Sequence, residues 1–351
     1  MVARSTAIGQ VEASHQVAPG AENRSRGAVA GTMLPGVWPS PFFTALRDAR
    51  RILIAGAGGG FDVYAGLPLA LALRTAGHQV WLGNLSIVNL HALDRSVWQL
   101  PGVATVTAQT LGPDDYFPEG TLARWLAANG LPSTVYAFPR TGVRPLRSAY
   151  RRLAKHLNLD AIVLVDGGTD ILCRGDEAGL GTPVEDATSL AAVAGTTVTT
   201  RLVACLGFGV DAYHGVNHTQ ILENIAALDR HGAYLGAFTL PSTSPETIRY
   251  RDAVAHAQAT TPTRASIVHG QIAAATRGEC GDIHATTRTT SGQLFVNPLM
   301  AMYFTFDLPG LARQSLYLDH IRHTDDMLQV AAAIDRFRDD ITPRPRITFP
   351  H

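Results

Sequence analysis

Lysine is almost absent from this chain of 351 residues, because Lys155 is its only lysine. No lysine therefore stands beside a glycine-rich loop, which excludes a phosphate-binding P-loop, and Schiff-base chemistry would depend on Lys155 alone. Cysteine is also scarce. The three cysteines, Cys173, Cys205 and Cys280, form no C-x-x-C pair. A zinc knuckle and a disulfide framework are therefore not expected, and the sequence predicts reduced thiols in a cytoplasmic protein.

An excess of charge of one sign is absent too, since 29 basic residues balance 29 acidic ones. The sequence therefore predicts no broad basic surface for nucleic acid or for an anionic membrane. Residues 1–32 are rich in Ala, Gly, Ser and Arg and hold neither a signal-peptide core nor a membrane span, so we expect a flexible N-terminal extension. No Pro/Ser-rich linker divides the remainder, which predicts a single domain over residues 33–345.

Strand-like and helix-like segments alternate from Arg51 onward. This order predicts an α/β fold with a doubly wound, mostly parallel sheet and helices on both faces, similar to a Rossmann fold. The expected strands are 52–56, 79–83, 103–107, 134–138, 161–165, 201–206, 234–238 and 266–269, with a weaker candidate at 294–296. The expected helices are 68–76, 119–129, 145–157, 187–195, 218–230, 245–258 and 324–338, the last capped by Thr324 and Asp325.

The segment from Arg51 to Ala76 joins a buried strand to a helix through a glycine-rich loop. Its N–H groups are predicted at the carboxyl edge of the sheet, where such folds bind ligands. We expect the loop glycines and the end of the next strand to bind a polar substrate, through Gly58, Gly59, Gly60 and Asn84. Phe61 stands where the dinucleotide fingerprint needs glycine, and Asp62 would repel a phosphate. Nucleotide binding in a non-standard loop, or simple helix capping by Asp62, remain alternatives.

Two further strands also end in glycines followed by an acid. One reaches Asp166 and Asp170 in DGGTD, and the other reaches Asp211 in GFGVD. Three such units at one sheet edge predict a common site, for which we expect carboxylate and histidine acid–base catalysis by Asp62, Asp166, Asp170 and His214. A divalent metal held by Asp211, His214 and His218 is a weaker alternative, because the two histidines have helical spacing but no H-E-x-x-H motif.

Polar residues near these units are candidates for substrate binding. They are Thr169, Arg174 and Glu177 after the second strand, and His284 and Arg288 in a threonine-rich segment near residue 285. Threonine hydroxyls and arginine suit an anionic group. The competing interpretations are a tight turn at DGGT, a structural ion-pair cluster over 174–177, and a solvent-facing loop around Arg288.

The motifs ILIAGAGGGFD, LVDGGTDILCRGDEAGLGTPVED, GFGVDAYHGVNH and IHATTRTTSGQLFVNPLM resemble those of a bacterial and archaeal family known only as a domain of unknown function. The similarity covers roughly Phe42 to Arg338 and supports the α/β fold without naming a reaction. The family pattern includes the glycine loop with Asp62, the segments 166–170, 174–177 and 284–288, and His214. The position of Cys173 is more often methionine there, which implies that this thiol is not a nucleophile.

These observations predict an enzyme, with the hydrolase, lyase and transferase classes left open, that acts on a small polar metabolite by acid–base chemistry. A divalent metal is a candidate cofactor, a nucleotide or NAD-type cofactor bound by the non-standard glycine loop is the alternative, and the chain is a candidate homo-oligomer. The lack of a G-x-S-x-G elbow argues against a serine hydrolase. A non-catalytic metabolite sensor, and a scaffold whose glycines serve only packing, are the competing classes.

Overall fold

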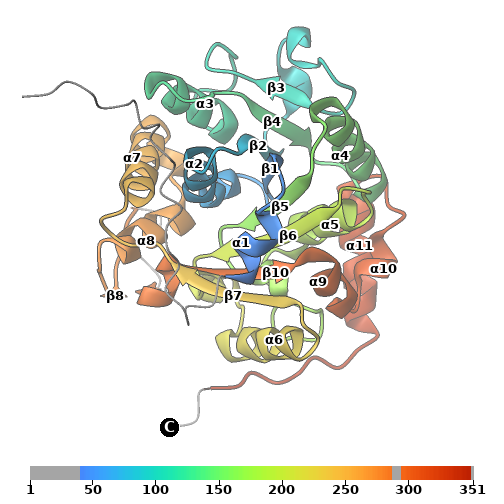
Figure 1. Cartoon of the computed structure of the whole chain (residues 1–351). Coiled ribbons are helices and arrows are strands. Elements are labelled where there is room, and N and C mark those ends of the chain that lie inside the picture. The colour runs from blue at the N-terminus through green and yellow to red at the C-terminus, as the bar shows by residue number, and fades with distance from the viewer. Residues whose placement is uncertain (1–39, 287–293, 349–351) are drawn as a thin grey trace, which may run out of the picture. The chain divides into compact units, whose positions relative to one another are not determined.

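The computed structural model describes residues 40–286 and 294–348. Through them runs an eight-stranded sheet in the order β3–β4–β2–β1–β5–β6–β10–β7 (Figure 1). The strands are β1 (Arg51–Gly56), β2 (Gln79–Ser86), β3 (Ala104–Val106), β4 (Val135–Pro139), β5 (Ala161–Asp166), β6 (Thr200–Leu206), β7 (Tyr234–Thr239) and β10 (Met302–Asp307). The four central pairings are parallel, and β3–β4, β6–β10 and β10–β7 are antiparallel.

Helices cover both faces of this sheet, as predicted. Successive side chains of a strand point to opposite faces, so Ile52 and Ile54 enter one apolar core and Leu53 and Ala55 the other. The first core is covered by α1 (Pro41–Leu46), α2 (Leu67–Thr75), α3 (Pro118–Ala128), α7 (Pro245–Thr260) and α8 (Ile267–Thr276). The second is covered by α4 (Val143–Leu157), α5 (Pro183–Ala194), α6 (His218–Arg230), α9 (Leu308–Gln314), α10 (Leu318–Ile321) and α11 (Met327–Asp339). The doubly wound α/β fold is confirmed.

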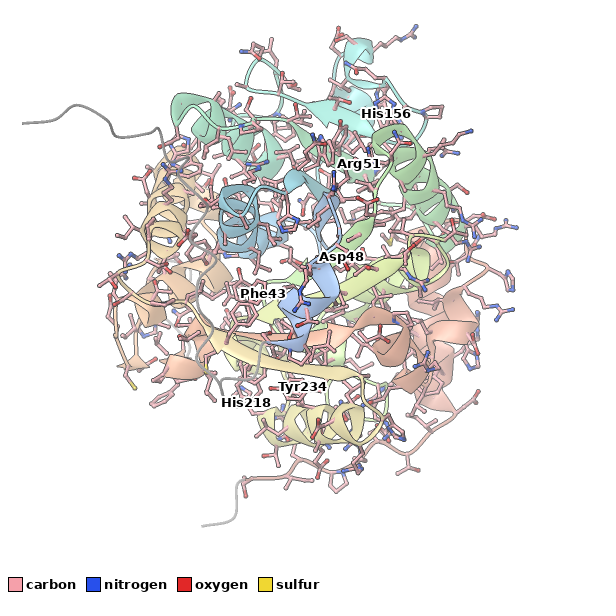
Figure 2. The ribbon with its side chains drawn as sticks, viewed as in Figure 1. Phe43, Asp48, Arg51, His156, His218 and Tyr234 are labelled. Carbon is pink, nitrogen blue, oxygen red and sulfur yellow. The ribbon has the colours of Figure 1, made fainter. Side chains whose placement is uncertain are left out.

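The amino ends of the central strands are fixed by main-chain contacts away from the candidate site. The N–H groups of Arg50 and Arg51 both donate to one carboxylate oxygen of Asp160, at 2.9 Å each. Asp160 precedes β5, so this contact aligns the starts of β1 and β5. Arg51 and the exposed Asp48 lie where the chain enters β1 (Figure 2). The glycine loop leaves the opposite end of the same strand.

Three details of the predicted secondary structure are wrong. The predicted strand 266–269 is the first turn of α8, capped by Ser266, whose hydroxyl accepts from the His269 N–H at 3.1 Å. The last helix begins at Met327 and its cap is Asp326, not Thr324 or Asp325. β10 was not foreseen as a separate strand, although it lies in a segment rich in apolar residues. The weak strand candidate at 294–296 contains β9 (Phe295–Val296), which pairs with β8 (Gly281–Asp282).

Two predicted features lie outside the described residues: the extension over residues 1–32, and Arg288. Within the described part of the chain, no helix combines the length and apolar character needed to cross a bilayer.

Candidate functional site

The glycine loop after β1 folds back onto Asp62. The Gly58 N–H donates to Asp62 Oδ2 at 2.6 Å, and the Asp62 N–H donates to the Gly59 carbonyl at 3.2 Å. A Cβ on Gly58 would lie 2.7 Å from Asp62 Oδ2 and 2.9 Å from both carboxylate oxygens of Asp186. Glycine at this position therefore lets two carboxyl groups approach the backbone closely. The Gly58 amide, which we predicted to hold an anionic substrate group, is bonded to a carboxyl group of the chain itself.

Asn84, near the carboxyl end of β2, forms a hydrogen bond with this loop. Its side-chain amide donates to the Gly60 carbonyl at 2.8 Å and to Glu119 Oε1 at 2.7 Å. Asn84 and Glu119 are both fully buried. Burial raises the pKa of Glu119 to about 7, although the hydrogen bond from Asn84 partly offsets this rise. The two donated bonds give Asn84 a role in positioning the loop, which differs from the substrate contact that we predicted.

Three carboxyl groups converge at the carboxyl edge of the sheet. Asp62 begins the 3₁₀ turn η1 (Asp62–Gly66), Asp166 ends β5, and Asp186 lies in the first turn of α5. One carboxylate oxygen from each can be chosen so that all three lie within 4.8 Å of one another, and among the described residues they are the only such group of three. Asp166 and Asp186 are buried, and Asp62 is partly buried.

Burial and mutual repulsion favour the protonated form of these three carboxyl groups. Burial raises the pKa of Asp62 to about 8, and the Gly58 amide opposes this shift. The pKa values of Asp166 and Asp186 are raised well above the ordinary 3.8, first by burial and then by neighbouring carboxylates, Asp170 foremost. The largest charge contributions to these pKa values come from other carboxylates. Among the described residues, the buried Asp186 Oδ1 has no hydrogen-bond partner.

Asp170 and Asp211 lie beside the three carboxyl groups, but one carboxylate oxygen of each accepts hydrogen bonds from a neighbouring loop. Asp170 Oδ2 accepts from the N–H and the hydroxyl of Thr182, at 2.8 and 2.9 Å. Asp211 Oδ2 accepts from the Thr169 N–H at 2.6 Å. Burial raises the pKa of Asp211 well above its usual range, and Asp170 adds to this rise. Thr169, predicted to bind substrate, is buried and donates to Asp211 in this structure.

His269 of α8 is an imidazole close to this group, and sequence reasoning missed it. Its Nδ1 lies 2.8 Å from the Tyr250 hydroxyl, and among the described residues its buried Nε2 has no partner in good hydrogen-bond geometry. A Cβ on Gly167 would lie 3.3 Å from that Nε2 and 3.2 Å from Asp62 Oδ1, so the two atoms face the same glycine. Burial lowers the pKa of His269 to about 4, while the nearby Phe61 carbonyl opposes the shift. The ring is therefore neutral at neutral pH.

The structure does not bring together the histidine-containing metal site that we predicted. His214 is exposed, and its ring contacts the Tyr213 ring. His218 Nε2 lies 2.9 Å from the Gly209 carbonyl, while Asp211 binds Thr169. The 3₁₀ turn η5 (Val210–His214) and the separate helix α6 replace the single helix that would have placed His214 and His218 on one face. Among the described residues these side chains form no metal-binding group of three.

Arg174 and Glu177 belong to an ion-pair cluster that binds the C-terminal segment, rather than to the carboxylate site. Glu177 is fully buried and accepts from the Arg174 N–H at 2.9 Å and from Arg344 Nη2 at 3.1 Å. Arg344 also pairs with Asp176, and Arg174 pairs with Asp176 as well. The structure thus favours the structural alternative over substrate binding for both residues. His284, partly exposed, lies 3.5 Å from Asp282.

Asp186 and Glu119 were also missed by sequence reasoning. Both stand in the first turn of a helix that begins with proline. Acidic residues are common there because they complement the helix dipole, so this signal alone did not distinguish them from helix-capping residues.

Comparison with known proteins gives a family but no activity. No curated protein matches the chain. The model of a family described as "Protein of unknown function (DUF1152)" matches residues 53–338. This match begins within β1 and includes the glycine loop and all three converging carboxyl groups. The chain therefore belongs to this family of unknown function.

Proposed function

We propose that this protein is a small-molecule enzyme in which Asp62, Asp166 and Asp186 hold a divalent cation. The observation that carries the proposal is the convergence of three carboxyl groups, two of them buried, whose pKa values are raised by burial and by neighbouring carboxylates. Burying several carboxylates together is costly unless a positive charge pairs with them. Carboxylate oxygens are the ligands that Mg²⁺, Mn²⁺ and Ca²⁺ prefer.

Two unsatisfied polar atoms support a bound ligand at this place. Within the described part of the chain, Asp186 Oδ1 and His269 Nε2 are buried and have no partner in good hydrogen-bond geometry, although the Phe61 carbonyl lies near the His269 ring. A buried polar atom without a partner costs about 1–3 kcal/mol, and a cation with its bound water or substrate would remove that cost for both. The glycines at positions 58 and 167 keep the intervening space free of side chains.

The chemistry would be hydrolysis or group transfer on a small polar metabolite. A divalent cation lowers the pKa of bound water and polarises a substrate oxygen. His269 is too weak a base to accept a proton at neutral pH, because its pKa is about 4. Tyr250, whose pKa is raised well above its usual range, stays protonated, and its hydroxyl lies 2.8 Å from Nδ1. In the tautomer in which this hydroxyl donates to Nδ1, the ring carries its proton on Nε2, where the Phe61 carbonyl, Asp62 or a substrate can accept it.

The same features weigh against nucleotide binding by the glycine loop. The Gly58 amide, which a phosphate would need, donates to Asp62. A cytoplasmic protein acting on a small molecule fits the three free cysteines, two of them buried. Homo-oligomer formation and the identity of the substrate stay predictions.

A thermal-unfolding series tests the metal site. Protein in EDTA is compared with protein in MgCl₂, MnCl₂ or CaCl₂ at pH 8, for the wild type, Asp186→Asn and the control Asp48→Asn, which changes an exposed carboxyl near the amino end of β1. At a hundred times the Kd, a cation should add about 2.7 kcal/mol to the free energy of unfolding. Wild type and Asp48→Asn should gain this stability, and Asp186→Asn should not. If none of the three cations stabilises the wild type, or if Asp186→Asn responds equally, the metal site is wrong.

Activity then distinguishes an enzyme from a sensor. The cation that stabilises the protein is added to a panel of phosphoesters, carboxylic esters, amides and glycosides. Turnover that is lost in Asp186→Asn supports the enzyme. Cation binding with no turnover on any class would instead favour a metabolite sensor at the same place.

A further inference from the structure

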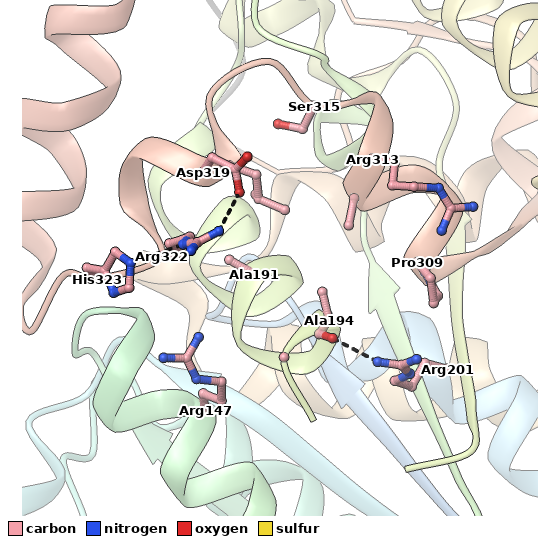
Figure 3. Close-up of a pocket in the computed structure, with 13 residues that line it drawn as sticks. Arg147, Ala191, Ala194, Arg201, Pro309, Arg313, Ser315, Asp319, Arg322 and His323 are labelled. Carbon is pink, nitrogen blue, oxygen red and sulfur yellow. Dashed lines mark hydrogen bonds and ion pairs between the residues drawn. The ribbon is translucent and has the colours of Figure 1, made fainter. Parts of the chain in front are cut away.

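A basic pocket lies at the other end of α5, away from the turn that carries Asp186. It has a volume of about 640 Å³, and the C-terminal turn of α5 forms its floor (Figure 3). The basic side chains that line it are Arg147 of α4, Arg201 of β6, Arg313 of α9, Arg322 and His323. Among the lining residues Asp319 is the single acid. The pocket therefore carries an excess of positive charge, in a chain whose charges balance overall.

The described residues leave part of this positive charge unpaired. Asp319 pairs with Arg322 at 3.3 Å. Within the described residues, Arg147 and Arg313 form neither an ion pair nor a side-chain hydrogen bond. Burial and the neighbouring guanidinium groups of Arg151 and Arg322 lower the pKa of Arg147, which shows that like charges gather around it.

Some of the side chains that line the pocket are held in fixed positions. Arg201 Nη1 donates to the carbonyls of Ala194 and Thr196, at 2.8 and 3.1 Å, which fixes its guanidinium group at the end of α5. Arg201 Nε and Ser315 Oγ are buried polar atoms of the pocket residues that lack hydrogen-bond partners. A Cβ at position 195 would lie 2.5 Å from Arg147 Cδ, so Gly195 allows that side chain to cross the helix end.

We propose that this pocket binds a small anion that carries at least two oxyanion groups, either phosphates or carboxylates. Arg147 and Arg322 stand on one side of the α5 floor, and Arg201 and Arg313 on the other (Figure 3). Guanidinium groups bind carboxylate and phosphate through paired hydrogen bonds. Two separated arginine pairs suit an anion with charge at both ends. The pocket uses none of the carboxyl groups of the proposed cation site, so the two proposals stand independently.

Titration calorimetry with pyrophosphate and with citrate, in EDTA at constant ionic strength, tests this proposal. Comparing the two anions shows whether the pocket prefers phosphate or carboxylate groups. We expect at least one of them to bind with a Kd of about 1 mM or lower. The double variant Arg147→Gln/Arg313→Gln should bind it at least about tenfold more weakly, because each arginine lost removes charged hydrogen bonds. Arg336→Gln removes an exposed charge on α11, outside the pocket, and should bind like the wild type.

An unchanged melting temperature without anion shows that the double variant is folded. We expect this result, since neither replaced side chain forms a hydrogen bond with a described residue. Equal binding by wild type and the double variant overturns the proposal. So does the absence of binding of both anions to the wild type, or an equal loss of affinity in Arg336→Gln.

Discussion

Replacing Asp62 by asparagine should change how the stability of the metal-free protein depends on pH. The substitution keeps the size of the side chain and removes one of the three converging carboxyl groups. The pKa of Asp62 is about 8 in the folded protein, against 3.8 for an ordinary aspartate. Between these pH values the folded carboxyl group keeps a proton that the unfolded chain has released. The free energy of unfolding therefore falls as the pH rises through this range, and levels off above about pH 8.

The size of the effect follows from the shift. One pKa unit corresponds to about 1.4 kcal/mol, so Asp62 alone should lower the free energy of unfolding by about 1.4 kcal/mol per pH unit between pH 5 and 7. Over the whole range this amounts to on the order of 5 kcal/mol, an upper limit because water reaches the partly buried side chain. Asp62 also raises the pKa values of Asp166 and Asp186. Its removal should therefore relieve repulsion at those groups as well.

The measurement is urea unfolding at pH 5, 6, 7, 8 and 9 in EDTA, at one ionic strength, followed by circular dichroism. Other groups titrate too, among them His269, whose lowered pKa makes stability fall as the pH drops from 6.5 towards 4. The informative quantity is therefore the free energy of unfolding of Asp62→Asn minus that of the wild type. This difference should increase by at least about 1 kcal/mol for each pH unit between pH 5 and 7. Asp48→Asn should show no such difference. If the Asp62→Asn and wild-type curves run parallel, the raised pKa of Asp62 is refuted.

Three further substitutions test the packing around the site. Asn84→Ala leaves the Gly60 carbonyl and the buried carboxyl group of Glu119 without the Asn84 donor. Urea unfolding should therefore show a decrease of about 2–3 kcal/mol in the free energy of unfolding. A decrease below roughly 0.5 kcal/mol, which is typical of a neutral surface change, would contradict this role. Gly58→Ala puts a Cβ within 2.9 Å of two carboxyl groups, and thermal unfolding should show that the cation no longer stabilises the protein. Arg344→Met leaves Glu177 buried without its cation, and urea unfolding should show a loss of about 3 kcal/mol; unchanged stability would show that the C-terminal ion pair is dispensable.

The fold could be predicted because most of its signals are local. Each central strand is a short apolar run, and the helix that follows it has its own periodicity, so the alternation is visible without knowledge of the pairing. The exceptions depend on the rest of the molecule. Ile267 and Val268 form a short apolar pair that fits a strand or a buried helix, and only Ser266, as a cap, favoured the helix. The antiparallel β10 pairs with β6, about a hundred residues earlier in the chain.

The site could be predicted where the signal lies within one loop. Asp166 ends a strand and Asp62 follows one through the glycine loop, and parallel strands bring such positions to one edge of the sheet. Asp186 reaches the same edge from the start of a helix, where an acid is equally well explained by the helix dipole. His269 reaches it from α8, which has no strand–glycine–acid signal. Long-range packing alone places these two side chains at the site.

The segments DGGTD and CRGDE look alike in sequence, because each gathers acids and glycines after the same strand. What separates them is the position of the nearest cation. Arg344 reaches Glu177 from 167 residues further along the chain and supplies the charge that this buried carboxylate needs. The largest charge contributions to the pKa of Asp166 come from Asp170, Asp62 and Asp211, which are all acids. A buried carboxylate with its own arginine is a structural element, whereas a buried group of carboxylates without a cation depends on protons or on a ligand. That difference, which no local motif encodes, assigns Asp166 to the candidate site and Glu177 to the framework.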